Sequence, residues 1–326
     1  MKNDDMEKYY NENPNHYKTG LMRIGCTRKQ ALNYSEYFDE FRDYYYNFVI
    51  KEVNRREGKE LKILDIGCGT GDDVFSLDKK LRDVKLYGYE LSEKTIKICQ
   101  DKKANLKPQN DITFFSAEIS NINEKFDLII NFCVLEHVGD PVDFIKNCSK
   151  LLREDGTIVM AVPNHYYWWY WNFINFILMK LLNKDIKTHS VLYDIVIKGV
   201  KNAGLCLNYH EIYGYRPPQD YFKLISEDYN GFVKIKNNFW MIDYSYKKLG
   251  LEKFLYLHLF VLSKHFVLSK HEQSIEVSKE NNKLKINDLY YLLMSFKYLL
   301  LYQRIALKGL LKGLFKRLLN KIGVKI

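Results

Sequence analysis

The chain has 326 residues, which is enough for one large domain or for one domain with an appendage. A hydrophobic fraction of 47% and a charged fraction of 28% are typical of a globular protein. The net charge of +10 is concentrated after Asp288, where the tail has eight lysines and arginines and no acidic residue; this argues against a nucleic-acid enzyme with a broad basic face, and we expect no nucleic-acid partner.

The cysteines and the start of the sequence indicate in which cellular compartment the protein is found. Six cysteines are scattered without CxxC pairs or metal-type spacing, so we expect reduced thiols, a cytoplasmic protein and a reaction without a metal ion. The polar start, MKNDDMEKYYNENPNHYK, has no apolar signal core, which predicts that the protein is not secreted.

Residues 1–58 are predicted to form a helical N-terminal cap, because YSEYFDEFRDYYYNFVIKEVNRR has apolar residues at helical spacing. From residue 61 onward, short apolar strands alternate with helices. Strands are predicted at 61–67, 84–90, 112–118, 126–134, 157–164 and 205–215, and helices at 72–81, 92–103, 141–156 and 190–204, with Ser92 as an N-cap and Gly156 as a helix stop. This alternation predicts an α/β fold with a doubly wound, mostly parallel sheet that binds ligands at the carboxyl ends of its strands.

Two segments interrupt this pattern. The apolar and aromatic run YYWWYWNFINFILMKLL (166–182) falls where a connection between a strand and a helix should lie. Beyond residue 250 the chain is rich in leucine and lysine, which predicts helices. We therefore expect a ligand-binding domain over 59–250 with an aromatic insertion at 164–189, followed by a helical, basic amphipathic extension over 251–326.

The stretch ILDIGCGTGDD (63–73) is the strongest candidate for a ligand-binding loop. No lysine follows Gly71, and two aspartates would repel a triphosphate, so a phosphate-binding loop of an NTPase is disfavoured. The third glycine comes one residue earlier than in the dinucleotide pattern GxGxxG, and Asp65 before the turn suits an ammonium group rather than a pyrophosphate. Glu90 can accept hydrogen bonds from two ribose hydroxyls, although enzymes that bind NAD share that feature.

Four motifs in order then resemble the class I S-adenosylmethionine-dependent methyltransferases. They are ILDIGCGTG, YGYELS, AEI, and FDLIINFCVLEHVGDP followed by LLREDGTIVMAVPN, within about residues 60–215. The combination looks most like the branch with ubiquinone-biosynthesis O-methyltransferases and bacterial small-molecule and glycan-cluster enzymes (methyltransferase type 11). The resemblance implies a seven-stranded Rossmann-like sheet and S-adenosylmethionine as the cofactor.

The resemblance also assigns cofactor-binding roles to individual residues. Asp65 and the turn formed by Gly67, Cys68, Gly69 and Gly71 would hold the methionine part of the cofactor. Glu90, with Leu91 beside it, would bind the ribose; Ala117 and Glu118 would flank the adenine amino group; the backbone carbonyl of Phe132 would meet the ammonium group.

An oxygen acceptor benefits from a general base with a pKa near neutrality, and histidine is the natural candidate. His137 follows the fourth predicted strand, but it can equally pin its loop through hydrogen bonds. His165 follows VPN at the substrate side of the sheet, and His189 is a further candidate. The sequence does not choose among them.

The apolar segments predict a membrane-linked substrate. In residues 305–326, Lys308, Lys312 and Lys316 lie on one helical face opposite a leucine-rich face, which is typical of an anchor on an anionic membrane; packing on the domain or on another subunit is the alternative. Residues 166–182 suit either a lid over the substrate or lipid contact.

These observations together predict a methyltransferase that O-methylates a lipidic, lipid-linked or glycan-type acceptor at the inner membrane face. Two alternatives stay open. One is a soluble methyltransferase of a small metabolite whose apolar segments form a homodimer. The other is a membrane-associated binding protein with a vestigial cofactor fold.

Overall fold

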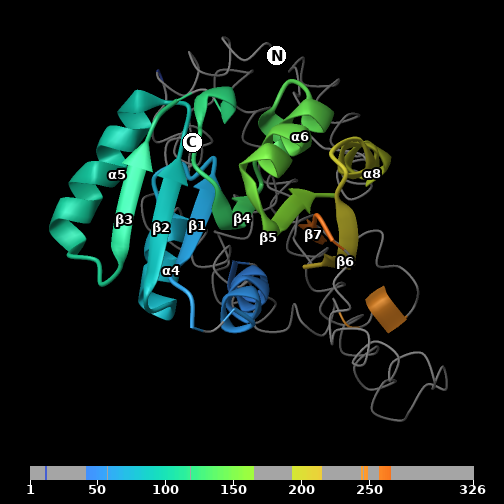
Figure 1. Cartoon of the computed structure of the whole chain (residues 1–326), viewed down its shortest axis with the longest axis horizontal. Helices are drawn as coiled ribbons and strands as arrows, with labels where there is room; N and C mark the ends of the chain where they lie inside the picture. Colours follow the sequence, from blue (N-terminus) through green and yellow to red (C-terminus); the bar gives the residue numbers. More distant parts are fainter. Residues whose placement is uncertain are drawn as a thin grey trace, which may run out of the picture.

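The computed structural model of the protein describes residues 12, 42–56, 58–117, 119–164, 193–214, 244, 246–248 and 257–265. Their centre is a seven-stranded sheet with the order β3-β2-β1-β4-β5-β7-β6 (Figure 1). The strands are β1 (Leu61–Ile66), β2 (Val84–Tyr89), β3 (Asp111–Phe115), β4 (Phe126–Phe132), β5 (Leu152–Pro163), β6 (Cys206–Tyr213) and β7 (Leu257–Ser263). The pairings from β3 to β5 are parallel, and β7 runs antiparallel to both β5 and β6. The predicted α/β fold with a mostly parallel, doubly wound sheet is therefore confirmed.

Helices cover both faces of the sheet (Figure 1). They are α4 (Asp72–Lys80), α5 (Glu93–Leu106), α6 (Pro141–Leu151) and α8 (Tyr193–Asn202), with short 3₁₀ turns η1 (Ile119–Asn121) and η2 (Leu135–His137), and residues 42–54 form a further helix. The predicted N-cap of α5 is confirmed, because the Ser92 hydroxyl accepts a hydrogen bond from the Thr95 amide at 3.2 Å. Within the described ranges, no helix combines the length and the apolarity needed to cross a bilayer.

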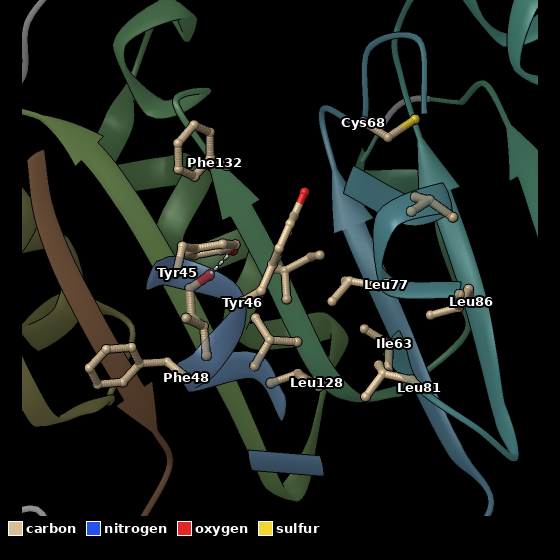
Figure 2. Close-up of a cluster of buried hydrophobic side chains, with 14 of the residues drawn as sticks. Tyr45, Tyr46, Phe48, Ile63, Cys68, Leu77, Leu81, Leu86, Leu128 and Phe132 are labelled. Atoms are coloured by element: carbon tan, nitrogen blue, oxygen red, sulfur yellow. Dashed lines mark hydrogen bonds between the residues drawn. The ribbon is translucent and has the colours of Figure 1, made fainter. Parts of the chain in front are cut away.

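The 42–54 helix is part of the main core. Tyr45, Phe48 and Val49 are at most 6% exposed and lie at positions i, i+3 and i+4, so one helical face packs on the sheet (Figure 2). The Tyr45 hydroxyl accepts a hydrogen bond from the Asn131 amide of β4 at 2.9 Å and donates one to the Val159 carbonyl of β5 at 2.8 Å. This helix therefore joins two neighbouring strands through a single side chain.

The prediction of a helix from residue 251 onward is wrong at Leu257–Ser263, which form β7 in the interior of the sheet. The sequence LHLFVLS is apolar on both faces, because β7 has neighbours in the core on each side of the sheet. A short run of this kind does not distinguish a buried strand from a buried helix by its period. The sheet therefore reaches past the predicted domain end at residue 250.

The predicted helix over 141–156 is also too long. Helix α6 ends at Leu151, and residues 152–156 belong to β5. Arg153 Nη1 donates to both carboxylate oxygens of Asp127 at 2.8 Å, and Leu152 pairs with Phe126 of β4. These contacts with β4 extend the strand toward its amino end, which local helix propensity does not indicate.

Most of the predicted appendages lie outside the described residues. Of the N-terminal cap, Glu12 and residues 42–56 and 58 are described; of the insertion over 164–189, only Asn164 is described. The basic tail over 305–326 lies entirely outside the described ranges.

A histidine pair, in which His258 is buried and His210 is partly buried, lies near the carboxyl end of β5. His210 Nε2 of β6 lies 2.9 Å from His258 Nδ1 of β7, and both rings stack on Phe260. Burial lowers the pKa of His210 to about 4, against a smaller opposing effect of Glu211. Burial, followed by the neighbouring His210, lowers the pKa of His258 to about 3. Both rings are therefore neutral in the folded protein near pH 5.

We expect this pair to make the folded protein sensitive to acid. In the unfolded chain each histidine takes up a proton near pH 6.5, whereas in the folded protein it does so only near pH 3 to 4. The stabilisation is therefore complete above about pH 6.5 and is lost as the pH falls toward 4. We expect His258→Gln to reduce the loss of unfolding free energy between pH 7 and pH 5 by roughly 1–2 kcal/mol.

Chemical denaturation at the two pH values measures this loss. His265→Gln is the matched control, because the His265 side chain stands just after the same strand and is 66% exposed. A pH dependence equal in the wild type and in both variants would show that the buried pair does not set the acid sensitivity.

Candidate functional site

The predicted cofactor residues gather at the carboxyl ends of β1, β2 and β4, the edge at which parallel strands of this fold class hold ligands. The turn after β1 is held against β2, because the amides of Gly67 and Cys68 both donate to the Tyr89 carbonyl, at 2.8 and 2.9 Å. On its other side, Cys99 of α5 donates from Sγ to the Gly69 carbonyl at 3.2 Å. The turn is thus fixed from two elements before any ligand is considered.

The three glycines of this turn have left-handed backbone conformations, with φ of 77°, 51° and 78° for Gly67, Gly69 and Gly71. A Cβ on Gly67 would lie 2.6 Å from Val134 Cγ2, and one on Gly71 would lie 3.0 Å from Phe75 Cε2. A Cβ on Gly69 would meet no described atom within 4 Å. Two of the glycines therefore serve packing, whereas the middle one faces open space.

Glu90 connects the end of β2 to the turn. Its Oε2 accepts a hydrogen bond from the Gly69 amide at 3.1 Å, and its Oε1 accepts from the amides of Leu91 at 2.8 Å and Ser92 at 3.4 Å. Burial raises the pKa of Glu90, and these three donors act in the opposite direction. These hydrogen bonds hold the Glu90 carboxylate beside Gly69.

Asp65, at the carboxyl end of β1, is 3% exposed, and its Oδ2 has no hydrogen-bond partner among the described residues. Burial raises the pKa of Asp65 well above its ordinary value; the nearby carboxylates of Asp73 and Glu90 add to this rise, and Arg42 opposes it. A buried carboxyl oxygen without a donor is costly unless a ligand supplies one. Asp65 is thus suited to receive a cationic group.

The 42–54 helix brings further charged residues to this edge, and sequence reasoning did not find them. Arg42 Nε lies 3.1 Å from Asp73 Oδ1, and the Arg42 guanidinium lies 5.5 Å from the ring centroid of Phe132. Tyr46 donates to the same Asp73 oxygen at 2.5 Å. In the sequence, the feature that could have indicated these contacts is a single arginine on the apolar face of the predicted helix, three residues before Tyr45.

The chain turns sharply at the end of β4, next to Arg42. Phe132, 9% exposed, contacts Tyr45 edge to face at a centroid distance of 5.3 Å. The next residue, Cys133, has a left-handed conformation with φ of 56°, which is strained for a residue with a side chain. This turn leads into η2, where His137 stands with Nε2 3.8 Å from Glu136 Oε1 and its side chain 26% exposed.

The remaining candidates are only partly described. Ala117 follows β3, and the Ser116 hydroxyl beside it donates to the Leu91 carbonyl at 2.9 Å, so the two segments assigned to adenine and ribose lie next to each other. Glu118, His165 and His189 lie outside the described residues. Among the residues that the structure describes, no group of three or more His, Cys, Asp or Glu side chains is arranged to hold a metal ion.

The family model described as "Methyltransferase domain" matches residues 57–226, just over half of the chain. The chain belongs to the class I S-adenosylmethionine-dependent methyltransferase family. The match contains the glycine turn, Asp65 and Glu90, and it ends before β7.

Curated relatives in this family include two ubiquinone biosynthesis O-methyltransferases. The protein from Pelagibacter ubique is 33% identical over 36% of this chain and 49% of its own length, and that from Rhizobium etli (strain ATCC 51251) is 32% identical over 45% and 54%. The chain therefore spans about half the length of these relatives.

A solved structure supports the fold. Magnesium protoporphyrin IX methyltransferase from Synechocystis PCC 6803, a structure with bound S-adenosylhomocysteine, is 14% identical to this methyltransferase-family chain with a TM-score of 0.51. The similarity covers 79% of this chain and 97% of the other. At this identity the likeness shows the fold alone.

The two kinds of glycine in the turn predict different effects of one added methyl group. We expect Gly69→Ala to change the free energy of unfolding by only about 1–2 kcal/mol, the usual cost of a left-handed alanine, while it weakens binding of S-adenosylhomocysteine by filling the open space. Gly67→Ala should destabilise the fold by more than that, because its methyl group collides with Val134. Thermal unfolding and calorimetric titration of both variants measure the difference. Equal effects of the two substitutions on stability, with unchanged ligand affinity for Gly69→Ala, would contradict the assignment of this space to a ligand.

Proposed function

We propose that the protein transfers a methyl group from S-adenosylmethionine to an oxygen atom of its acceptor. Three observations carry the proposal: the open space at Gly69, the buried Asp65 oxygen without a hydrogen-bond donor, and the Glu90 carboxylate that accepts from the Gly69 amide. When bound, S-adenosylmethionine supplies a methyl group already activated by its sulfonium. The names of the ubiquinone relatives support an oxygen acceptor.

The residues present suit each part of this cofactor. The unpartnered Oδ2 of Asp65 is an acceptor for the ammonium group, and the Glu90 carboxylate, kept in place by backbone amides, accepts from ribose hydroxyls. Arg42, whose positive charge reaches Asp65, is the candidate partner for the cofactor carboxylate. The cofactor would therefore be bound through both charged groups of its amino-acid part.

The protein's own contribution to the reaction is alignment and proton removal. A turn held by β2 and α5 positions the methyl donor, which favours an in-line approach of the acceptor oxygen. His137, in η2 directly after β4, is the candidate base among the described residues, and its partly exposed imidazole can take a proton from an acceptor hydroxyl. This role for His137 stays a prediction.

Glu90 provides the test of the cofactor. We expect Glu90→Ala to weaken S-adenosylmethionine by roughly 1.5–3 kcal/mol, the usual range for lost hydrogen bonds to a charged group. Glu90→Gln keeps the shape of the side chain and separates the loss of charge from loosening of the turn. Calorimetric titration measures the affinities, and a thermal unfolding scan of each variant verifies the fold. Binding of NADH in place of the methyl donor would replace this proposal with a dinucleotide-dependent activity.

For the acceptor, we propose a lipidic or lipid-linked molecule reached at the inner face of a membrane. The support is in the sequence: the basic tail over 305–326 with leucines opposite its lysines, and the aromatic run over 166–182. Basic residues near an anionic membrane contribute about 1 kcal/mol each, an attraction that salt weakens.

Truncation of the tail tests this location. We expect a chain that lacks residues 305–326 to bind anionic phosphatidylserine-containing vesicles much less than the full chain does, with unchanged affinity for S-adenosylhomocysteine, because the cofactor motifs lie earlier. Flotation at low and high salt, with neutral phosphatidylcholine vesicles as the control, measures binding. Salt-independent binding, or unfolding of the truncated chain, would favour packing of the tail on the protein or on a second subunit.

A further inference from the structure

Three carboxyl groups converge on the proposed cofactor site, and the structure treats them differently. Glu90 accepts hydrogen bonds from three backbone amides, those of Gly69, Leu91 and Ser92. Amide donors of this kind stabilise the charged form of a carboxyl group. Glu90 therefore has three amide donors that oppose the rise in its pKa caused by burial.

Asp73, at the start of α4, has a different set of partners. Its Oδ1 accepts from the Tyr46 hydroxyl at 2.5 Å and lies 3.1 Å from Arg42 Nε. The acidic residue also stands in the first turn of a helix, where the helix dipole favours negative charge. Asp73 therefore has a hydroxyl donor, a guanidinium and the amino end of a helix beside its carboxyl group.

Asp65 has none of these partners among the described residues. It is 3% exposed, its Oδ2 has no donor, and the amides of the adjacent turn are directed to Tyr89 and Glu90 instead. An ionised carboxylate in such a place loses its hydration without compensation, and a buried carboxyl group without a partner takes up a proton instead.

We propose that Asp65 carries a proton in the ligand-free protein and releases it when the ammonium group of the cofactor binds, so that cofactor binding is coupled to proton release. This inference rests on the proposed function. The proton balance is simple: the carboxylic acid and the ligand ammonium become an ion pair, and one proton passes to solvent. No oxidant or further reactant is needed.

The charges around Asp65 act in the same direction. Burial is the largest cause of its raised pKa, and the negative charge of Asp73 is the next; the Arg42 guanidinium opposes this rise, whereas Glu90 and Cys99 add to it. The titratable and charged groups that face Asp65 come from the 42–54 helix, the turn, α4, the residue after β2, and α5; they are Arg42, Tyr45, Cys68, Asp73, Glu90 and Cys99. With three carboxyl groups and one guanidinium, the site favours a ligand that carries a positive charge.

Below the pKa of Asp65 in the ligand-free protein, the affinity for a ligand with an ammonium group should rise about tenfold per pH unit, and it should level off above that pKa. The α-amino group of the ligand is itself protonated below about pH 7.7, so its own titration does not produce this rise.

Calorimetric titration of the full chain with S-adenosylhomocysteine tests the coupling. The titrations are made between pH 5.5 and 7.5 in phosphate and in imidazole buffers, whose different ionisation enthalpies report the number of protons released. We expect about one proton per ligand at the low end of this range and fewer at the high end. 5′-Methylthioadenosine, which has the nucleoside but no amino-acid part, is the matched ligand and should release none.

Asp65→Asn is the matched variant, because its amide is similar in shape to a protonated carboxyl group. It should fold with at least the thermal stability of the wild type, bind S-adenosylhomocysteine without proton release, and show an affinity that no longer changes between pH 5.5 and 6.5. If Asp65→Asn does not fold, the proton release of the wild type with S-adenosylhomocysteine, compared with that with 5′-methylthioadenosine, still tests the coupling. Binding of S-adenosylhomocysteine with no proton release at any pH in this range overturns the coupling and leaves the cofactor assignment intact, whereas failure of both nucleosides to bind overturns the proposed function.

Discussion

Close packing of the Gly67–Gly71 turn against its neighbours is the constraint on which the site depends. The side chains of Val134 and Phe75 fill the space that Cβ atoms on Gly67 and Gly71 would need. This packing restricts the backbone conformation of the turn between β1 and α4. The same conformation brings the Gly69 amide to Glu90 and leaves the face of Gly69 open. A site that must align a reactive methyl group needs this kind of rigid support, because alignment is the main contribution that the protein makes.

The 42–54 helix joins the core to the site. Its buried face holds Tyr45 between β4 and β5, while Arg42 and Tyr46 on the same helix reach Asp73 at the carboxyl edge. A change in the position of this helix on the sheet would therefore alter both the charge that faces Asp65 and the packing of the sheet. Stability and electrostatics of the site share one element, which matters for any substitution in its apolar face.

Much of the fold and of the cofactor edge could be predicted from the sequence, because both leave local patterns. Alternating apolar strands and helices indicate the sheet, and the spacing of Gly67, Gly69 and Gly71 after Asp65 indicates the turn. The wrongly predicted segments have a common feature: tertiary contacts determine their secondary structure. The run at 257–263 becomes a strand because partners on both sides bury it, and Arg153 leaves the predicted helix because Asp127 is available in β4. Arg42 could not be assigned, since only packing of its helix shows which carboxylates it approaches.

The position of β7 has a consequence for how the chain is made. β7 lies between β5 and β6, yet Leu257 emerges from the ribosome long after Pro163 at the end of β5. At a synthesis rate of about 5–20 residues per second, the inner edge of β5 waits on the order of ten seconds for its neighbour. An unpaired apolar edge is a template for wrong pairing during that interval. A gene fragment that ends at residue 226, where the family match ends, would lack β7 altogether, so shortened forms of the protein should extend at least to Ser263 to keep β5 paired with β7.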